Sequence, residues 1–231
     1  MRSVKAIFKK QAKDSFKNRM VLVQFLIFPI MAFVLTELVA KPSEDIPDAM
    51  FVTMFAAMFS GMAPLTMTAG AIAEDKEHKS LRFLVTAGVK PQEYLLGVGG
   101  FVLLICSLMS VAFGFIGGFA GLDLPQFISV LILGSAASML LGASIGILSK
   151  NQQAATATSV PVFMLLSFTP MIANFNDSVA KLATVFYTQQ VNTLVNDSSG
   201  SVGKAFLIML GNIAVFLVLF VLAYQKKGLK G

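Results

Sequence analysis

The chain has 231 residues, of which 56% are hydrophobic and only 13% are charged. A soluble domain carries charge on about 25% of its residues, so this composition excludes an ordinary soluble fold. The single cysteine, Cys106, and the single histidine, His78, also exclude a disulfide framework and a metal site built from cysteines or histidines.

Six long runs contain no charged residue, and each approaches or exceeds the roughly 20 residues that a helix needs to cross a bilayer. The short alternating segments that are typical of an outer-membrane barrel are missing. We therefore predict an all-α integral membrane protein with six transmembrane helices in one domain, residues 1–231. The predicted spans are residues 20–39, 50–73, 94–121, 126–148, 154–174 and 204–224.

The first predicted element, residues 1–19, combines basic residues with an apolar stripe. Val4, Ile7, Phe8, Ala12 and Phe16 recur at helical spacing, and the lysines lie largely off that stripe. We predict an interfacial amphipathic helix with its apolar face in membrane lipid and its lysines toward the headgroups. The alternative is a solvated basic leader.

Methionines at four-residue spacing mark the second predicted span: Met50, Met54, Met58 and Met62. Methionine is flexible and polarizable, so it suits surfaces that accept varied apolar partners. This stripe either lines a path for hydrophobic substrates or is lipid-facing or packed filler.

The connection at residues 74–92 contains a second amphipathic pattern. Leu81, Leu84 and Val85 lie at helical spacing, and acidic residues precede them, where the positive end of a helix favours negative charge. Gly88 and Pro91 provide a stop. We predict a short helix here, with an interfacial linker as the alternative.

Small residues recur every four positions in the fourth predicted span: Gly134, Ser138, Gly142 and Gly146. A face of this kind lets helices approach closely in lipid. We expect it to pack within the chain, and a contact between subunits is the alternative.

The segment at residues 177–203 mixes apolar residues with glutamine and asparagine and is too polar to cross the membrane. Short helices that enter part of the outer half of the membrane would satisfy their own backbone groups there. We predict an extracellular gate segment, and an inert surface cap is the alternative.

Lysine and arginine are distributed unequally between the two sides of this arrangement. One side carries seven before residue 20, four in residues 74–93, Lys150 and three C-terminal lysines. The other side carries only Lys41, Lys181 and Lys204. Because positive residues concentrate on the cytoplasmic side, we predict that both termini are cytoplasmic. The net charge of +6 then reflects topology and contact with lipid headgroups, and no nucleic-acid partner is expected.

Ionisable groups are almost absent from the predicted spans. Glu37, near the outer end of the first span, is the exception, although ion- and proton-coupled pumps generally need such groups in the membrane. We therefore expect no catalytic residue, no cofactor or metal site and no ATP site in this chain. Glu37 leaves a stand-alone ion- or proton-coupled carrier as an alternative.

Residues 73–97 resemble the first cytoplasmic loop of the permeases of type-2 ATP-binding-cassette (ABC) transporters. The matching positions are Glu74, Lys76, Glu77, Ser80, Leu81, Leu84, Thr86, Glu93, Tyr94, Leu95 and Gly97. The chain departs from the family pattern because no glycine precedes Leu81, Ala87 replaces a common proline, and Val98 replaces a common lysine.

This resemblance implies a permease subunit of an exporter in the cell membrane. Two permease subunits, identical or related, would join two cytoplasmic ABC ATPase subunits that bind ATP and Mg²⁺. Residues in the loop would couple ATP hydrolysis to transport: Glu74, Lys76, Glu77, Ser80, Leu81 and Leu84. The translocation path would be lined by Met54, Met58, Met62, Phe163 and Phe168.

The expected cargo is amphipathic or hydrophobic, such as a peptide antibiotic, a drug or a lipid-like molecule. Besides the stand-alone carrier, the alternative is a non-transporting membrane protein, an immunity factor or a scaffold.

Overall fold

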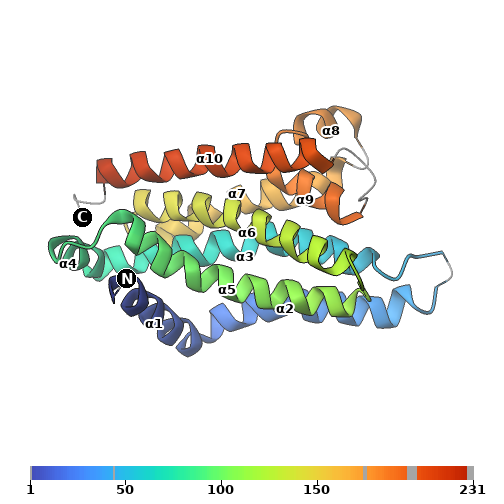
Figure 1. Ribbon diagram of the computed structural model, residues 1–231, viewed down its shortest axis with the longest axis horizontal. Helices are drawn as coiled ribbons and strands as arrows, with labels where there is room; N and C mark the ends of the chain where they lie inside the picture. Colours follow the sequence, from blue (N-terminus) through green and yellow to red (C-terminus); the bar gives the residue numbers. More distant parts are fainter. Residues whose placement is uncertain (1, 44, 174–175, 197–201, 228–231) are drawn as a thin grey trace.

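The computed structural model describes residues 2–43, 45–173, 176–196 and 202–227. Every regular element within these ranges is a helix, and no strand occurs in them (Figure 1). The elements are α1 (Arg2–Lys17), α2 (Arg19–Leu35), the π-helix η1 (Thr36–Ala40), α3 (Met50–Glu77), α4 (Ser80–Thr86), α5 (Pro91–Ile116), α6 (Asp123–Leu148), α7 (Gln152–Ala173), α8 (Asp177–Ala183), α9 (Tyr187–Asn196) and α10 (Val202–Lys227).

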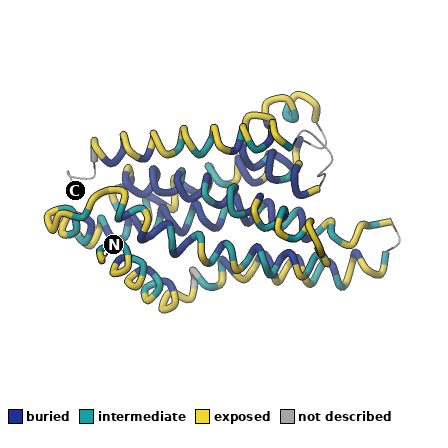
Figure 2. Tube along the Cα trace, viewed as in Figure 1, coloured by how far each residue is buried: buried dark blue, intermediate teal, exposed yellow. Residues whose placement is uncertain are grey.

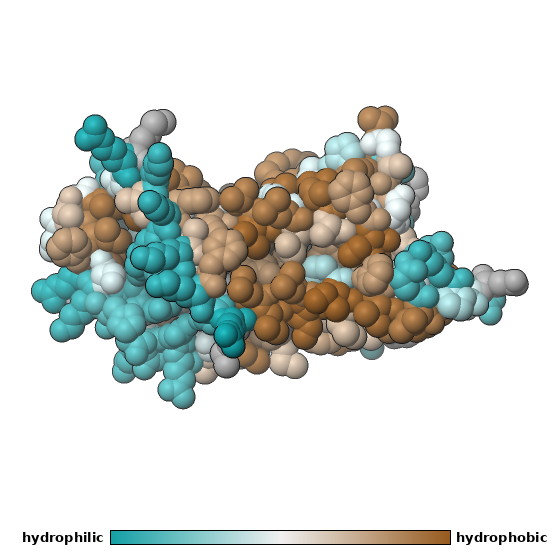
Figure 3. Space-filling model, turned by 90° about the horizontal axis from the view of Figure 1, so that it is seen from below, coloured by the Kyte–Doolittle hydropathy of each residue, from teal (hydrophilic) through white to brown (hydrophobic). Residues whose placement is uncertain are grey.

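Six of these helical segments are long and apolar enough to cross a membrane: α2 continued by η1, then α3, α5, α6, α7 and α10. Figure 3 shows an apolar surface between two hydrophilic ends, as expected of helices in a bilayer. The predicted all-α membrane fold with six transmembrane helices is thereby confirmed.

Two helix ends differ from the predicted boundaries. α3 continues to Glu77, a full turn past residue 73, because its terminal charged residues are held by neighbouring helices. α5 ends at Ile116 although the charge-free run continues, because Gly118 and Gly121 adopt positive φ angles of 68° and 60°. Charge is therefore a poor marker of a helix end at both places.

α3 and α6 form the centre of the bundle (Figure 2). α3 packs against α2, α5, α6, α7 and α9, whereas α10 contacts mainly α6 and α9 and exposes most of its surface. The central pair therefore connects nearly all other helices.

The small residues of α6 create the contact with α3. A methyl group added at Gly142 would overlap the carbonyl of Leu65, and one added at Gly146 would lie 2.7 Å from the carbonyl oxygen of Ala69. Ser138 in the same row donates to the carbonyl of Ser60. The prediction that this row packs within the chain is confirmed.

α1 lies against α5 rather than wholly in lipid. Ile7 is buried and covers Gly97, where an added methyl group would lie 2.6 Å from the Ile7 side chain. Phe8 and Phe16 both meet Phe101 edge to face, although Phe16 stays largely exposed. Part of the stripe that we expected in lipid is therefore covered by the protein itself.

Two short helices, α8 and α9, occupy the end of the bundle opposite α4 (Figure 1). α9 is anchored by the buried Tyr187, whose hydroxyl lies 2.6 Å from that of Ser138. Of the predicted gate segment, residues 197–201 lie outside the described residues, as do residue 1 of the predicted interfacial helix, residue 174 of the fifth span and residues 228–231 of the predicted domain.

Candidate functional site

The chain turns sharply between α3 and α4. Lys79 adopts a left-handed conformation with φ of 61°, which ends α3 and allows α4 to start at Ser80. Glu74 and Glu77 therefore belong to the last turn of α3, whereas we had expected them at the N-terminal end of the short helix that follows. Acidic residues are unfavourable at a helix C-terminus, so other contacts must hold this turn.

Asp75 provides the first of these contacts. Its side chain is only 3% exposed, and it accepts hydrogen bonds from the Lys10 ammonium group and, at 2.8 Å, from the Tyr94 hydroxyl. A buried carboxylate is stable only when it is paired and hydrogen-bonded. Asp75 thus connects α3 to α1 and α5.

Lys10 is held by the same contact. Burial lowers the pKa of its ammonium group, while the hydrogen bond and the negative charge of Asp75 raise it, and the pKa is raised overall. Lys10 also pairs with Asp14 one helical turn away. We had predicted that Lys10 faces lipid headgroups with the other lysines of residues 1–19. Its ion pair with Asp75 is a contact that the sequence did not reveal.

Lys76 and Glu77 hold the turn between α6 and α7. The Lys76 ammonium group donates to the carbonyl oxygens of Ile147 at 2.8 Å and Ser149 at 2.9 Å, at the C-terminus of α6. The Glu77 carboxylate accepts from the backbone N–H of Gln152 at 3.0 Å, at the start of α7. Each charge is opposite in sign to the end of the helix dipole that it faces, which makes both contacts favourable. These two predicted coupling residues therefore bind their own chain.

The remaining predicted coupling residues face inward from α4. Leu81 is 2% exposed and packs in an apolar cluster with Ile7, Tyr94 and Tyr224, and Leu84 packs at its edge. Ser80 is partly buried.

The outer face of α4 carries a different apolar residue. Phe83 is 73% exposed and lies next to the exposed Arg82. We had not singled out Phe83 from the sequence. Its place between two inward-facing leucines, at positions 81 and 84, is the signal that could have identified it.

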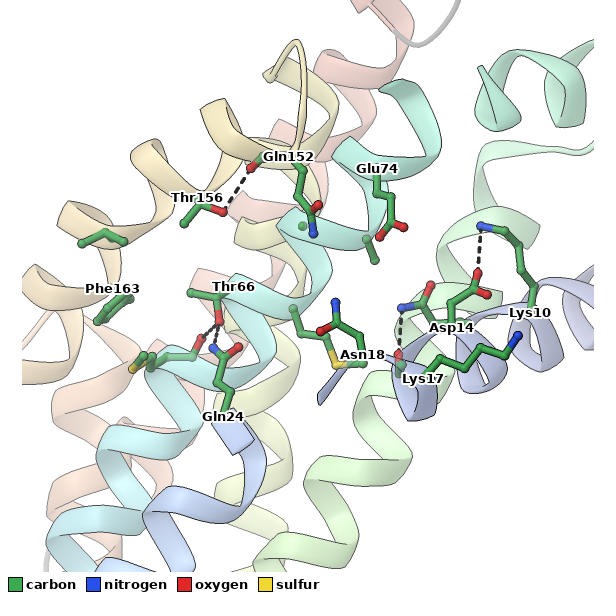
Figure 4. A pocket seen from close by; sticks show the side chains of 17 residues that line it. Lys10, Asp14, Lys17, Asn18, Gln24, Thr66, Glu74, Gln152, Thr156 and Phe163 are labelled. Atoms are coloured by element: carbon green, nitrogen blue, oxygen red, sulfur yellow. Dashed lines mark hydrogen bonds and ion pairs between the residues drawn. The ribbon is translucent and has the colours of Figure 1, made fainter. Parts of the chain in front are cut away.

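A groove lies near this end of the bundle, between α1, α2, α3 and α7, with a volume of about 610 Å³ (Figure 4). The wall from α3 carries Met62, Thr66 and Glu74, and the wall from α7 carries Gln152 and Phe163. The groove is most polar toward α1, whereas Met62 and Phe163 give its other part an apolar surface beside the hydrogen-bonded pair Gln24 and Thr66. It can therefore accommodate a molecule with one polar and one apolar end.

The groove includes two of the five predicted path residues, Met62 and Phe163. Met54 and Met58 continue the same row of α3 beyond the groove and are partly buried. Phe168 is 37% exposed on α7 and does not line the groove. The structure therefore brings only one end of the predicted path together with the charged end of α3.

Comparison with known families agrees with this arrangement. The family model described as ABC-2 family transporter protein matches residues 6–222. The chain belongs to this family.

As an ABC-2 permease, the chain is a multi-pass membrane subunit of a transporter, and its family implies association with ABC ATPases. The resemblance that we inferred from residues 73–97 is thus confirmed. No curated protein matches the sequence. The roles of individual residues in this ABC-2 permease, both for coupling and for the path, remain predictions.

Proposed function

We propose that this ABC-2 permease exports amphipathic or hydrophobic cargo across the cell membrane, driven by ATP hydrolysis in separate subunits. Two cytoplasmic ATPase subunits bind ATP and Mg²⁺, and a second permease subunit, identical or related, completes the path. Both termini are cytoplasmic. The basic residues of α1 and of the α3–α4 turn at one end of the molecule support this orientation.

The observation that carries the proposal is the set of contacts made by three consecutive residues at the end of α3. Asp75 holds α1 and α5, Lys76 holds the end of α6, and Glu77 holds the start of α7. α4 follows immediately, with Leu81 buried in the same end of the bundle. A force on α4 therefore reaches five helices over a short distance.

α4 receives that force through its exposed face. Phe83 inserts into an apolar depression of the ATPase, and the neighbouring Arg82 pairs with an acidic rim there. Phenylalanine and arginine are both enriched at protein interfaces, and here both are exposed on one helix. Leu81 and Leu84 transmit movement because they pack inside the permease, and they are not contact residues.

The groove supports amphipathic cargo, since its polar and apolar ends lie along one continuous surface of α3 and α7. The stand-alone carrier receives no such support. The Glu37 side chain in η1 is 38% exposed, pairs with Lys41 one turn away and lies about 20 Å along the helix from Gln24 in the groove wall. No contact of the described residues favours an immunity or scaffold role over transport.

The test compares two exposed phenylalanines in liposomes that contain the permease and its ATPase. Phe83→Ala should reduce cargo-stimulated ATP hydrolysis and cargo transport at least tenfold, because truncation of a central anchor commonly costs 2 kcal/mol or more. Phe115→Ala is the matched control, since Phe115 is 70% exposed at the opposite end of α5. Normal transport by the Phe83 variant would refute the proposed coupling.

A further inference from the structure

The groove contains one carboxylate, Glu74, with which none of the described side chains forms an ion pair. Four of its lining residues are ionisable: Lys10, Asp14, Lys17 and Glu74. Lys10 is shared between Asp14 and the buried Asp75. Including Asp75, three carboxylates therefore face two ammonium groups in and directly behind the groove wall.

Glu74 is the carboxylate without a partner. Among the residues that the structure describes, the Glu74 side chain has neither an ion pair nor a hydrogen bond. Lys17 extends along α1, away from Glu74 (Figure 4). An unpaired negative charge in a partly enclosed cavity attracts a cation, because the low dielectric of the walls strengthens the interaction.

Amide groups surround the same space. Gln152 extends over Gly70, where an added methyl group would lie 3.8 Å from its Nε2 atom. Figure 4 shows Gln152 and Asn18 directed into the space that Glu74 also faces. Their polar groups can replace part of the water around a bound charged group.

The apolar part of the groove begins on the same wall. Met62 lies twelve residues before Glu74 on α3, which is about 18 Å along the helix axis. Val160 and Phe163 of α7 face this part. A ligand that reaches from Glu74 to Met62 therefore spans about 18 Å, with a cationic end and an apolar body.

The geometry points to a binding site for hydrophobic organic cations, with Glu74 facing the positive charge and Met62, Val160 and Phe163 contacting the apolar body. This inference rests on the proposed export function, because it assigns the chemical class of cargo. It concerns the groove as a whole and assigns Glu74 to cargo recognition, although the sequence pattern placed Glu74 among the coupling residues.

The test measures binding to the whole chain in nanodiscs without any ATPase. Dodecyltriphenylphosphonium is the cationic probe, and dodecyldiphenylphosphine oxide is a neutral probe with the same chain; empty nanodiscs give the background partition. Glu74→Gln should weaken binding of the cation about tenfold and leave binding of the neutral probe unchanged. Phe163→Ala should weaken binding of both probes.

Glu37→Gln is the control, since Glu37 is a carboxylate at the far end of the bundle. Equal binding of the cation to the wild type and to the Glu74 variant would overturn the inference, as would tighter binding of the neutral probe to the wild type. If the cation binds through Glu74 but is not moved by the complex with its ATPase and ATP, the site stands and the export proposal fails.

Discussion

At the scale of single residues, Asp75 shows how a charge is accommodated at the end of a membrane helix. Its carboxylate is buried, and donors from α1 and α5 compensate for the lost water. Lys10 keeps contact with solvent, so the pair avoids the full cost of burying two charges. The arrangement fixes α1 against the bundle through one side chain.

Replacing Asp75 with alanine should lower the free energy of unfolding by about 1–3 kcal/mol, because the buried Tyr94 hydroxyl loses its acceptor. Thermal unfolding in detergent, followed by circular dichroism, measures this change. Asp14→Ala removes an exposed partner of the same lysine and should cost less than about 0.5 kcal/mol. Similar losses in the two variants would contradict the role given to Asp75.

The pairing of Asp75 could not be predicted from the sequence. Lys10 lies 65 positions away and has the spacing of an ordinary headgroup lysine, and Tyr94 lies 19 positions away at the start of another helix. The same holds for Lys76 and Glu77, whose partners are backbone groups of a distant turn. The sequence pattern singled out this segment, but it could not tell which of its residues face inward.

At the scale of helices, the contact between α3 and α6 depends on the absence of side chains. Gly142 and Gly146 bring the backbones close enough that Cβ atoms would clash with carbonyl groups of α3. In lipid, where burial of apolar surface gives little gain, such contacts are a principal source of helix association. The row was recognisable in the sequence because its four-residue period follows from helix geometry alone.

Gly142→Ala should therefore destabilise the protein by about 1–3 kcal/mol, since the added methyl group meets backbone that cannot move aside. Gly211→Ala in α10 is the control, because a methyl group there meets no atom within 4 Å. It should leave the melting temperature unchanged or raise it slightly. Equal melting temperatures of the Gly142 variant and the control would contradict the prediction, because α3 and α6 could then move apart at little cost.

Helix ends were harder to predict than helices. The six apolar runs marked the transmembrane helices well because apolar length is what a bilayer selects. The left-handed Lys79 carries no such signal, since lysine is not a residue that favours positive φ. The short helix predicted within residues 74–92 therefore did not separate the end of α3 from α4.

At the scale of the whole molecule, the distribution of charge predicts its orientation. In a Cys106→Ala background, a cysteine at Lys5 should escape a membrane-impermeant maleimide in intact cells, and one at Asp45 should react. Both positions are exposed, so accessibility within the protein does not limit labelling. Labelling at Lys5 alone would contradict the predicted topology, because α4 would then lie on the side of the membrane away from the ATPase.

The length of α3 has a consequence for the depth of the charged groups. Its 28 residues extend about 42 Å, whereas the hydrocarbon layer is about 30 Å thick. If its outer end is level with the hydrocarbon boundary, about two turns project on the other side, from near Gly70 to Glu77. Glu74 and its neighbours then lie at the depth of the lipid headgroups. An amphiphile in the leaflet on the Glu74 side would reach the groove by lateral diffusion, and its charged end would stay in the headgroup layer throughout.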